Sequence, residues 1–199
     1  LIHIGYAFEL DSRIVGIEAL AMTAVCYNYL HEVVDKLKLP KYPSKSAIEI
    51  FKDVRSDTYL PIYDAPGVDN LQLIVENHTD RVLSHYNQWK INTENIEKTI
   101  EELFDLTVYI YGATHKPDQI VFDFFLLHLL TSMHAIRVIY SHIHNQQIFQ
   151  HILLQLIYFA IVLYIFKVVQ FLIGLIHPYE IIMNCQLYIK IRNNQRSIF

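Results

Sequence analysis

The sequence predicts an all-α protein, a bundle of about six to seven helices with two very apolar helices at its centre. Glycine and proline number only 5 and 6 among the 199 residues, and the stretches between them are too long for strands. Apolar residues recur there at three- and four-residue spacing, which is the helical period. Hydrophobic residues make up 53% of the chain and charged residues 18%, a composition shifted toward burial that excludes intrinsic disorder.

The first elements are expected before the prolines at positions 40 and 43. If residues 1–10 are helical, His3 and Tyr6 share one face of that helix. Asp11 or Ser12, each a good N-cap, begins a helix that should run to about residue 37, because apolar residues recur at helical intervals throughout this stretch.

The middle of the chain is expected to hold three helices. Ser44 should cap a short helix over residues 46–54, followed by an irregular connection over residues 56–67. A long helix is expected over residues 68–89. Thr93 should cap another over residues 96–111, with Gly112 as the residue that ends it.

The two most apolar helices are expected over residues 122–140 and 146–176, because each is apolar on nearly every side. The run over residues 152–166 is interrupted only by Gln155, so a membrane helix is the alternative to a buried one. A membrane span needs about 20 apolar residues, and this run stops at Lys167. We therefore favour the buried helix, with a membrane anchor through residues 152–176 as the competing interpretation.

Composition also bears on partners and compartment. The formal charge is −4, with 16 basic and 20 acidic residues, and the basic residues form no stripe that would neutralise phosphates, so no nucleic-acid partner is expected. Cys26 and Cys185 are far apart in apolar surroundings, which predicts no disulfide and a cytoplasmic protein. The chain starts at Leu1, and we expect it to be a fragment that lacks an N-terminal part.

Motifs for metals and nucleotides are absent from the sequence. None of the eleven histidines has another three or four residues away, and no Glu-x-x-His occurs, so no metal site is predicted. The five glycines are too dispersed for a G-x-G-x-x-G or Walker loop. A nucleotide cofactor would need another type of site.

Polar side chains interrupt the apolar helix over residues 122–140. At 100° per residue Asp123 and His134 lie within about 20° of each other, while His128 and Thr131 belong to a second polar stripe. This stripe is a candidate lining for a cavity. In the alternative interpretation, the imidazole and hydroxyl groups bond to carbonyl oxygens and have only a structural role.

Three segments carry a resemblance to a known family: residues 1–9 (LIHIGYAFE), residues 18–21 (EALA) and residues 122–138 (FDFFLLHLLTSMHAIRV). They resemble the questin oxidase-like family, over roughly the first five-sixths of the chain. The resemblance implies an all-helical protein, mostly fungal and typically about twice as long. It also implies an oxidoreductase, a monooxygenase that uses NADPH and O₂ for Baeyer–Villiger-type oxidation of an aromatic, anthraquinone-like polyketide ketone.

The matching positions, taken with the burial argument, give the candidate site. We predict catalytic roles for His128, His134, Asp123 and His3, and contacts with a small aromatic substrate for Tyr6, Phe125 and Thr131. The helical domain is expected over residues 1–177, and residues 178–199 form a tail with no assignment. The alternatives are a helical membrane-anchored protein and a helical ligand-binding module without turnover.

Overall fold

The computed structural model describes residues 1–63, 68–113 and 122–169. Within these ranges the chain is all-α, as predicted, with eight α-helices and a short π-helix and no strand. The helices are α1 (Ile2–Glu9), α2 (Arg13–Val25), α3 (His31–Val34), α4 (Ala47–Ser56), α5 (Asp69–Tyr86), α6 (Ile96–Ala113), α7 (Phe124–Tyr140) and α8 (Gln146–Tyr164), and the π-helix η1 covers Ile165–Val169.

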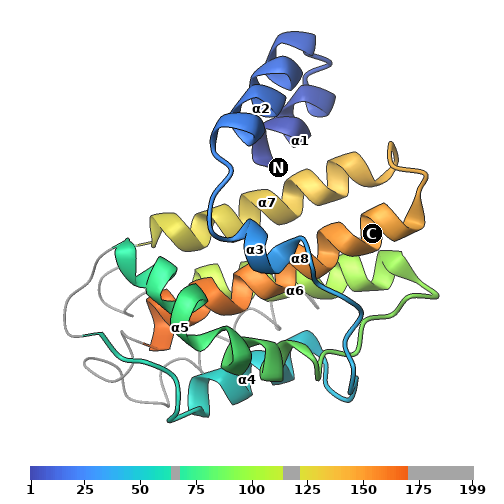
Figure 1. Ribbon diagram of the computed structural model, residues 1–199. Helices are drawn as coiled ribbons and strands as arrows, with labels where there is room; N and C mark the ends of the chain where they lie inside the picture. Colours follow the sequence, from blue (N-terminus) through green and yellow to red (C-terminus); the bar gives the residue numbers. More distant parts are fainter. Residues whose placement is uncertain (64–67, 114–121, 170–199) are drawn as a thin grey trace.

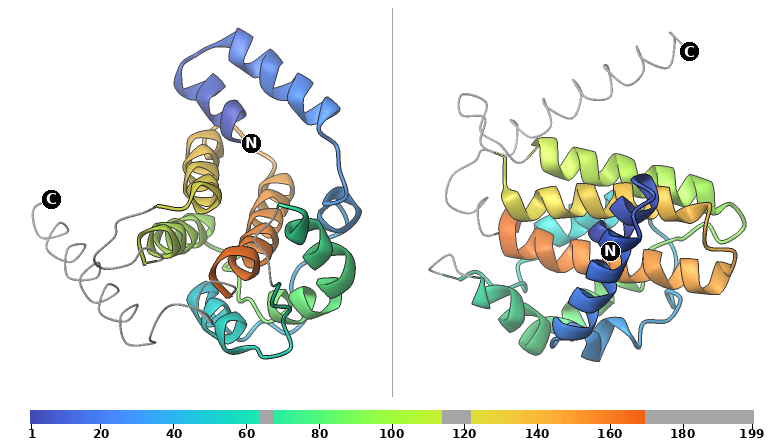
Figure 2. Two further views of the ribbon diagram at one scale, coloured as in Figure 1. Left: turned by 90° about the vertical axis from the view of Figure 1, so that its left-hand side faces the viewer. Right: turned by 90° about the horizontal axis from the view of Figure 1, so that it is seen from above.

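Helix α8 is the centre of the bundle. It contacts α3, α4, α5 and α7, and it continues directly into η1. Helix α7 lies beside it and also packs on α6, so that α6, α7 and α8 run next to one another (Figure 1; Figure 2). This arrangement confirms that the two most apolar segments of the sequence lie side by side in the bundle.

Helix α8 is also long and apolar enough to cross a membrane by length and composition alone. The segment Gln146–Lys167 has a mean hydropathy of 2.0, but 67% of it is buried against the rest of the protein. Eleven of its residues between Phe149 and Tyr164 are buried, because other helices surround it. This burial is typical of the core helix of a soluble protein and agrees with the interpretation favoured from the sequence.

Helices α1 and α2 form a hairpin, which we call the arm, that stands on α7 apart from the bundle (Figure 1). Helix α2 packs on α1, and α1 packs on α7. The contact between α1 and α7 is close because Gly5 has no side chain: a Cβ atom at this position would lie 2.5 Å from the Ala135 Cβ. Gly5 is therefore the residue that allows the two helix backbones to meet.

The helix expected to end near residue 37 is interrupted. Helix α2 ends at Val25, and α3 begins at His31. Between them, the side chain of Asn28 accepts a hydrogen bond from the backbone of Leu30, 3.0 Å away, and this local bond competes with the helical ladder. The Tyr27 ring also stacks on the His31 ring at 4.0 Å. The prediction of one continuous helix was wrong because the spacing of apolar residues gives no information about such local bonds.

Three predicted helix ends are also corrected, and one is confirmed. Ser12 is the N-cap of α2, as expected. The N-cap of α4 is Ser46 rather than Ser44. Asn95 rather than Thr93 precedes α6 and accepts a hydrogen bond from the Lys98 backbone, and α6 continues through Gly112 to Ala113. The expected continuation of the last helix beyond residue 169, like the tail over residues 178–199, lies outside the described residues.

We expect replacement of Ser46 by alanine to destabilise the protein by about 1 kcal/mol, the usual value of an N-cap. The Glu49 carboxylate accepts hydrogen bonds from both the backbone and the hydroxyl of Ser46, at 2.8 and 2.7 Å. Urea unfolding would measure the loss. The control is Ser44→Ala, two residues away, which should leave stability within about 0.5 kcal/mol of the parent value. Equal losses from the two variants would contradict the assignment of the cap.

Candidate functional site

Two histidine–carboxylate pairs involve α1, one with α7 and one with α2. The Nε2 atom of His134, on α7, lies 3.4 Å from the Glu9 carboxylate at the end of α1. The Nδ1 atom of His3, on α1, lies 3.9 Å from the carboxylate of Glu18 on α2. All four side chains are 43 to 58% exposed, so solvent and a ligand can reach them. We call these four residues and Tyr6 the crossing cluster.

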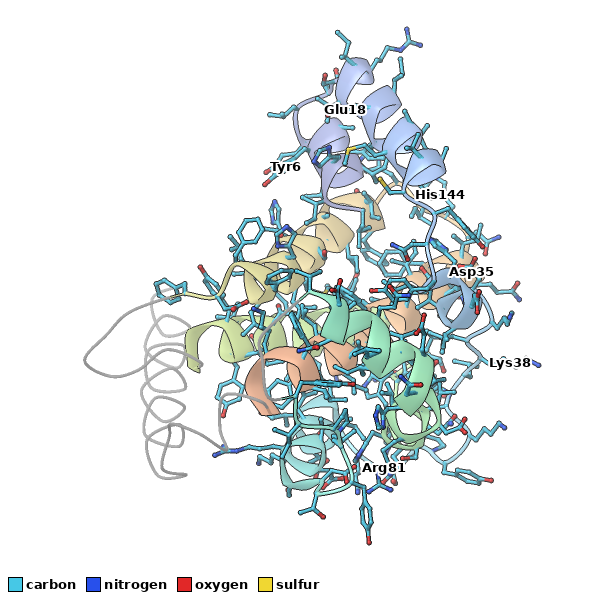
Figure 3. All side chains as sticks on the ribbon, turned by 60° about the vertical axis from the view of Figure 1, so that its left-hand side comes forward. Tyr6, Glu18, Asp35, Lys38, Arg81 and His144 are labelled. Atoms are coloured by element: carbon cyan, nitrogen blue, oxygen red, sulfur yellow. The ribbon has the colours of Figure 1, made fainter. Side chains whose placement is uncertain are left out.

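Tyr6 lies between the two pairs. His3, Tyr6 and Glu9 follow one another at three-residue spacing on α1, so they spread over about 120° of the helix surface with Tyr6 in the middle. Tyr6 is 41% exposed, and Figure 3 shows it below Glu18 on the arm. The arrangement thus brings together three of the residues predicted from the sequence, and it adds two carboxylates that the sequence did not single out.

A histidine oriented by a carboxylate is a recurrent arrangement for proton transfer, because the carboxylate fixes the ring and stabilises its protonated form. A tyrosine hydroxyl can donate a hydrogen bond to a carbonyl oxygen. The crossing cluster therefore contains groups suited to acid–base chemistry on an oxygen-bearing ligand. Among the described residues, no group of three or more His, Cys, Asp or Glu side chains is arranged to hold a metal ion.

Asp123 does not pair with His134. It is the N-cap of α7, where its carboxylate accepts hydrogen bonds from the backbones of Phe125 and Leu126 at 2.8 and 3.0 Å, and it also pairs with Lys167 at 3.1 Å. The sequence places Asp123 and His134 close together only by their angle around the helix. Eleven residues also separate the two side chains by about 16 Å along the axis, and Glu9 from α1 takes the expected place of Asp123.

His128 and Thr131 bond to the backbone of their own helix. The Nδ1 atom of His128 lies 2.7 Å from the Phe124 carbonyl oxygen, and the Thr131 hydroxyl donates to the Leu127 carbonyl at 3.1 Å. The structural interpretation of the polar stripe therefore holds for these two residues. Because a carbonyl only accepts, Nδ1 of neutral His128 carries the proton, and Nε2 keeps its lone pair. His128 also points about 120° away from His134 around α7.

Phe125 packs into the bundle. Its ring lies edge-on to the Phe166 ring at 5.5 Å, and the Lys167 ammonium lies 4.3 Å from the centre of the Phe125 ring. Phe125 is thus part of an aromatic contact between α7 and η1, at a distance from the crossing cluster along α7. Its predicted role in substrate binding stays a prediction.

Two cations and one helix N-terminus that could hold the phosphates of a nicotinamide dinucleotide are already occupied in the described part of the chain. Such a site needs free cations or open helix N-termini. The start of α7 is occupied by the Asp123 carboxylate, and Lys167 pairs with that same carboxylate. Arg81 is held by Asp57. We therefore assign no contact with NADPH phosphates to Asp123, Lys167 or Arg81.

His3, His128 and His134, all predicted to be catalytic, do not meet in one place, since His128 lies on a different side of α7 from the crossing cluster. Two pockets of about 240 and 270 Å³ lie elsewhere, and neither is lined by histidine. The first lies within the arm, and the second lies near the start of α6.

A second cluster of charged side chains joins the end of α4 to α5, with Asp57 and His85 buried and Arg81 42% exposed. Asp57, just after α4, accepts two hydrogen bonds from the Arg81 guanidinium at 2.6 and 2.8 Å and lies 2.6 Å from the His85 Nε2. The Asp57 side chain is only 2% exposed. Burial alone would raise its pKa, but the bonds from Arg81, from His85 and from the Tyr59 backbone outweigh burial and lower the pKa to about 2.

The spacing of residues in the sequence reveals only two members of this cluster, Arg81 and His85. Arg81 and His85 are four residues apart on one helix face, but the nearby Glu76 and Asp80 are typical of a solvated face. The carboxylate partner comes from 24 residues earlier, and no local spacing reveals such a contact. The network joins the end of α4 to α5 through bonds among its own side chains, so we regard it as structural.

The fold and the crossing cluster define a class: an all-α protein with solvent-accessible, carboxylate-paired histidines at a helix crossing. A model of the questin oxidase-like family matches residues 1–180. The chain belongs to the questin oxidase-like family, as the sequence motifs predicted, and at the level of that family it is an oxidoreductase. No curated protein and no solved structure matches the chain.

Proposed function

We propose that this protein catalyses a Baeyer–Villiger-type oxidation, inserting one oxygen atom of O₂ beside the carbonyl carbon of an aromatic polyketide ketone, with NADPH as the reductant. The other oxygen atom leaves as water, and NADPH supplies the two electrons that this step requires. Family membership supports the class of reaction. The proposed cofactor and substrate class rest on the resemblance to the family alone. We also propose that the protein acts in the cytoplasm.

The observation that carries the proposal is the pairing of His134 with Glu9 beside Tyr6 on an accessible surface. Oxygen insertion requires removal of a proton from the attacking oxygen and delivery of a proton as the adduct collapses. We assign the proton transfers to His134, with Glu9 holding its ring. Tyr6 would donate a hydrogen bond to the substrate carbonyl oxygen, which polarises it toward attack.

The direct test incubates the purified chain with a hydroxyanthraquinone, NADPH and O₂, and follows NADPH oxidation together with the mass of the product. Ring-opened or ester product with one added oxygen, formed in step with NADPH loss, is the expected result. Binding of the anthraquinone without NADPH oxidation or product would replace the proposal by the ligand-binding alternative.

Replacement of His134 by glutamine should lower kcat in this assay by about 10²-fold, since a positioned acid–base group commonly contributes that much. The matched control is His128→Gln on the same helix, whose imidazole bonds to its own backbone and should affect kcat less than tenfold. Circular dichroism would confirm that both variants fold. A larger loss in His128→Gln would move the acid–base role to the Nε2 atom of His128.

A further inference from the structure

Helix α2 carries an apolar surface that nothing in the described part of the chain covers. Only Ala19 of this helix is buried. Ile14, Ile17, Leu20 and Val25 are 80, 69, 65 and 83% exposed. These four residues, with Ala21 and Ala24, occupy an arc of about 140° around the helix. We call this surface the arm face.

The arm face is as large as the largest apolar patches that monomeric proteins expose. Taking about 150 Å² for each large apolar residue, its four large side chains expose about 450 Å², and the alanines with the neighbouring Leu10, itself 66% exposed, bring the area near 600 Å². The largest apolar patch on a typical monomer is about 300–600 Å² and is often functional. A stable interface buries at least about 600 Å² on each partner, so this face together with Leu10 reaches the required size.

We propose that the arm face is the contact surface of a symmetric dimer, in which α2 packs antiparallel against α2 of a second copy. An antiparallel pair centred between Ala19 and Leu20 places Ile14 opposite Val25 of the second copy. Ala21 and Ala24 lie in the middle of the face, where their small side chains let the two helices approach closely. The contact is self-complementary and therefore closes at two copies.

The charges of the arm agree with this arrangement. Arg13 is the first residue of α2, and the antiparallel pairing brings it to the C-terminal end of the second α2, where helix carbonyl groups carry partial negative charge. The last turn of α2 holds no basic residue that would repel it. Glu18 lies at the edge of the face and pairs with His3 of its own chain. The arm also stands away from the bundle (Figure 2), so a second copy can reach α2.

Light scattering coupled to size-exclusion chromatography tests the proposal on the whole chain. At about 100 μM we expect twice the chain mass of 23.5 kDa, with dissociation on dilution. Ile17→Glu should weaken the dimer at least 100-fold, because it buries an unpaired carboxylate. The control Leu73→Glu adds the same charge on α5, where Leu73 is 38% exposed, and should leave the dimer intact. Circular dichroism should show unchanged helicity in both variants.

Cross-linking supplies a second measurement. In a chain whose native cysteines are replaced by serine, a cysteine at position 21 should be joined to its counterpart by a short bismaleimide, whereas a cysteine at position 73 should not. A monomer at all concentrations, assembly beyond two copies, or a dimer that Ile17→Glu leaves intact would each overturn the proposal. All of these measurements are made without substrate, so their outcome is separate from that of the oxidation assay.

Discussion

Replacing Asp57 by alanine is expected to lower the free energy of unfolding by about 3 kcal/mol, the low end of the range for removing one partner from a buried ion pair, because Asp57 is buried while Arg81 is 42% exposed. The change leaves the His85 ring, which is 7% exposed, without its carboxylate, and it frees the Arg81 guanidinium. It also removes the acceptor for the Tyr59 backbone N–H. Urea denaturation followed by circular dichroism would measure the effect.

The control for this variant is Asp53→Ala. Asp53 also pairs with a cation, Lys45, but both side chains are more than one-third exposed, and exposed pairs contribute about 0–1 kcal/mol. A loss in Asp57→Ala as small as that in Asp53→Ala would show that the buried network does not stabilise the fold.

The network also predicts how stability depends on pH. The pKa of Asp57 is about 2 in the folded protein against an ordinary 3.8, so the folded state holds the ionised form more strongly. The stabilisation is fully present above about pH 4 and is lost as the pH falls through 2. In Asp57→Asn this part of the acid dependence should disappear, and the slope of unfolding free energy between pH 4 and pH 2 should become shallower than in the parent.

Replacing Gly5 by valine is expected to destabilise the protein by about 3 kcal/mol, at the upper end of the usual cost of overpacking. A Cβ atom at Gly5 would lie 2.5 Å from the Ala135 Cβ and 2.7 Å from its Cα. Because one of these atoms belongs to the backbone of α7, a side-chain rotation cannot relieve the contact. Helix α1 must therefore shift, which separates Glu9 from His134 and should also lower turnover.

Gly112→Val is the matched control, because a Cβ atom at Gly112 meets no other atom within 4 Å. Thermal unfolding and the oxidation assay would be run on both variants. If Gly5→Val were as stable and as active as Gly112→Val, the close crossing of α1 and α7 would not be needed by either the fold or the site.

The helices were predictable because the apolar period is strong. The two helices flanking the turn at residues 141–145 follow the predicted limits closely at their inner ends, Tyr140 and Gln146. Their burial was predictable too, since apolar residues cover nearly all of each helix. The break after Val25 was not, because it depends on the side chain of Asn28 and on a ring contact between Tyr27 and His31.

The site was only partly predictable for a different reason. His3, Tyr6 and His134 were selected from the sequence, and the structure brings them to one crossing. The pairing of His134 with Glu9 depends on how α1 lies across α7, and that of His3 with Glu18 depends on how α2 packs on α1. Helical periodicity specifies neither. The same limit applies to Asp123, whose position at the start of the helix suited it to capping rather than to pairing with His134.

The arm joins the bundle through α1, through the stacking of Phe8 on His142 at 4.4 Å and through the link over residues 26–30, while α2 keeps most of its surface outside the core. A segment with so few buried contacts opens at a lower free energy than the helices around α8. We therefore expect the amide hydrogens of the arm, above all those of α2, to exchange with solvent sooner than those of the helices around α8. Since Glu9 lies in the arm, each opening of the arm also takes apart the Glu9–His134 pair.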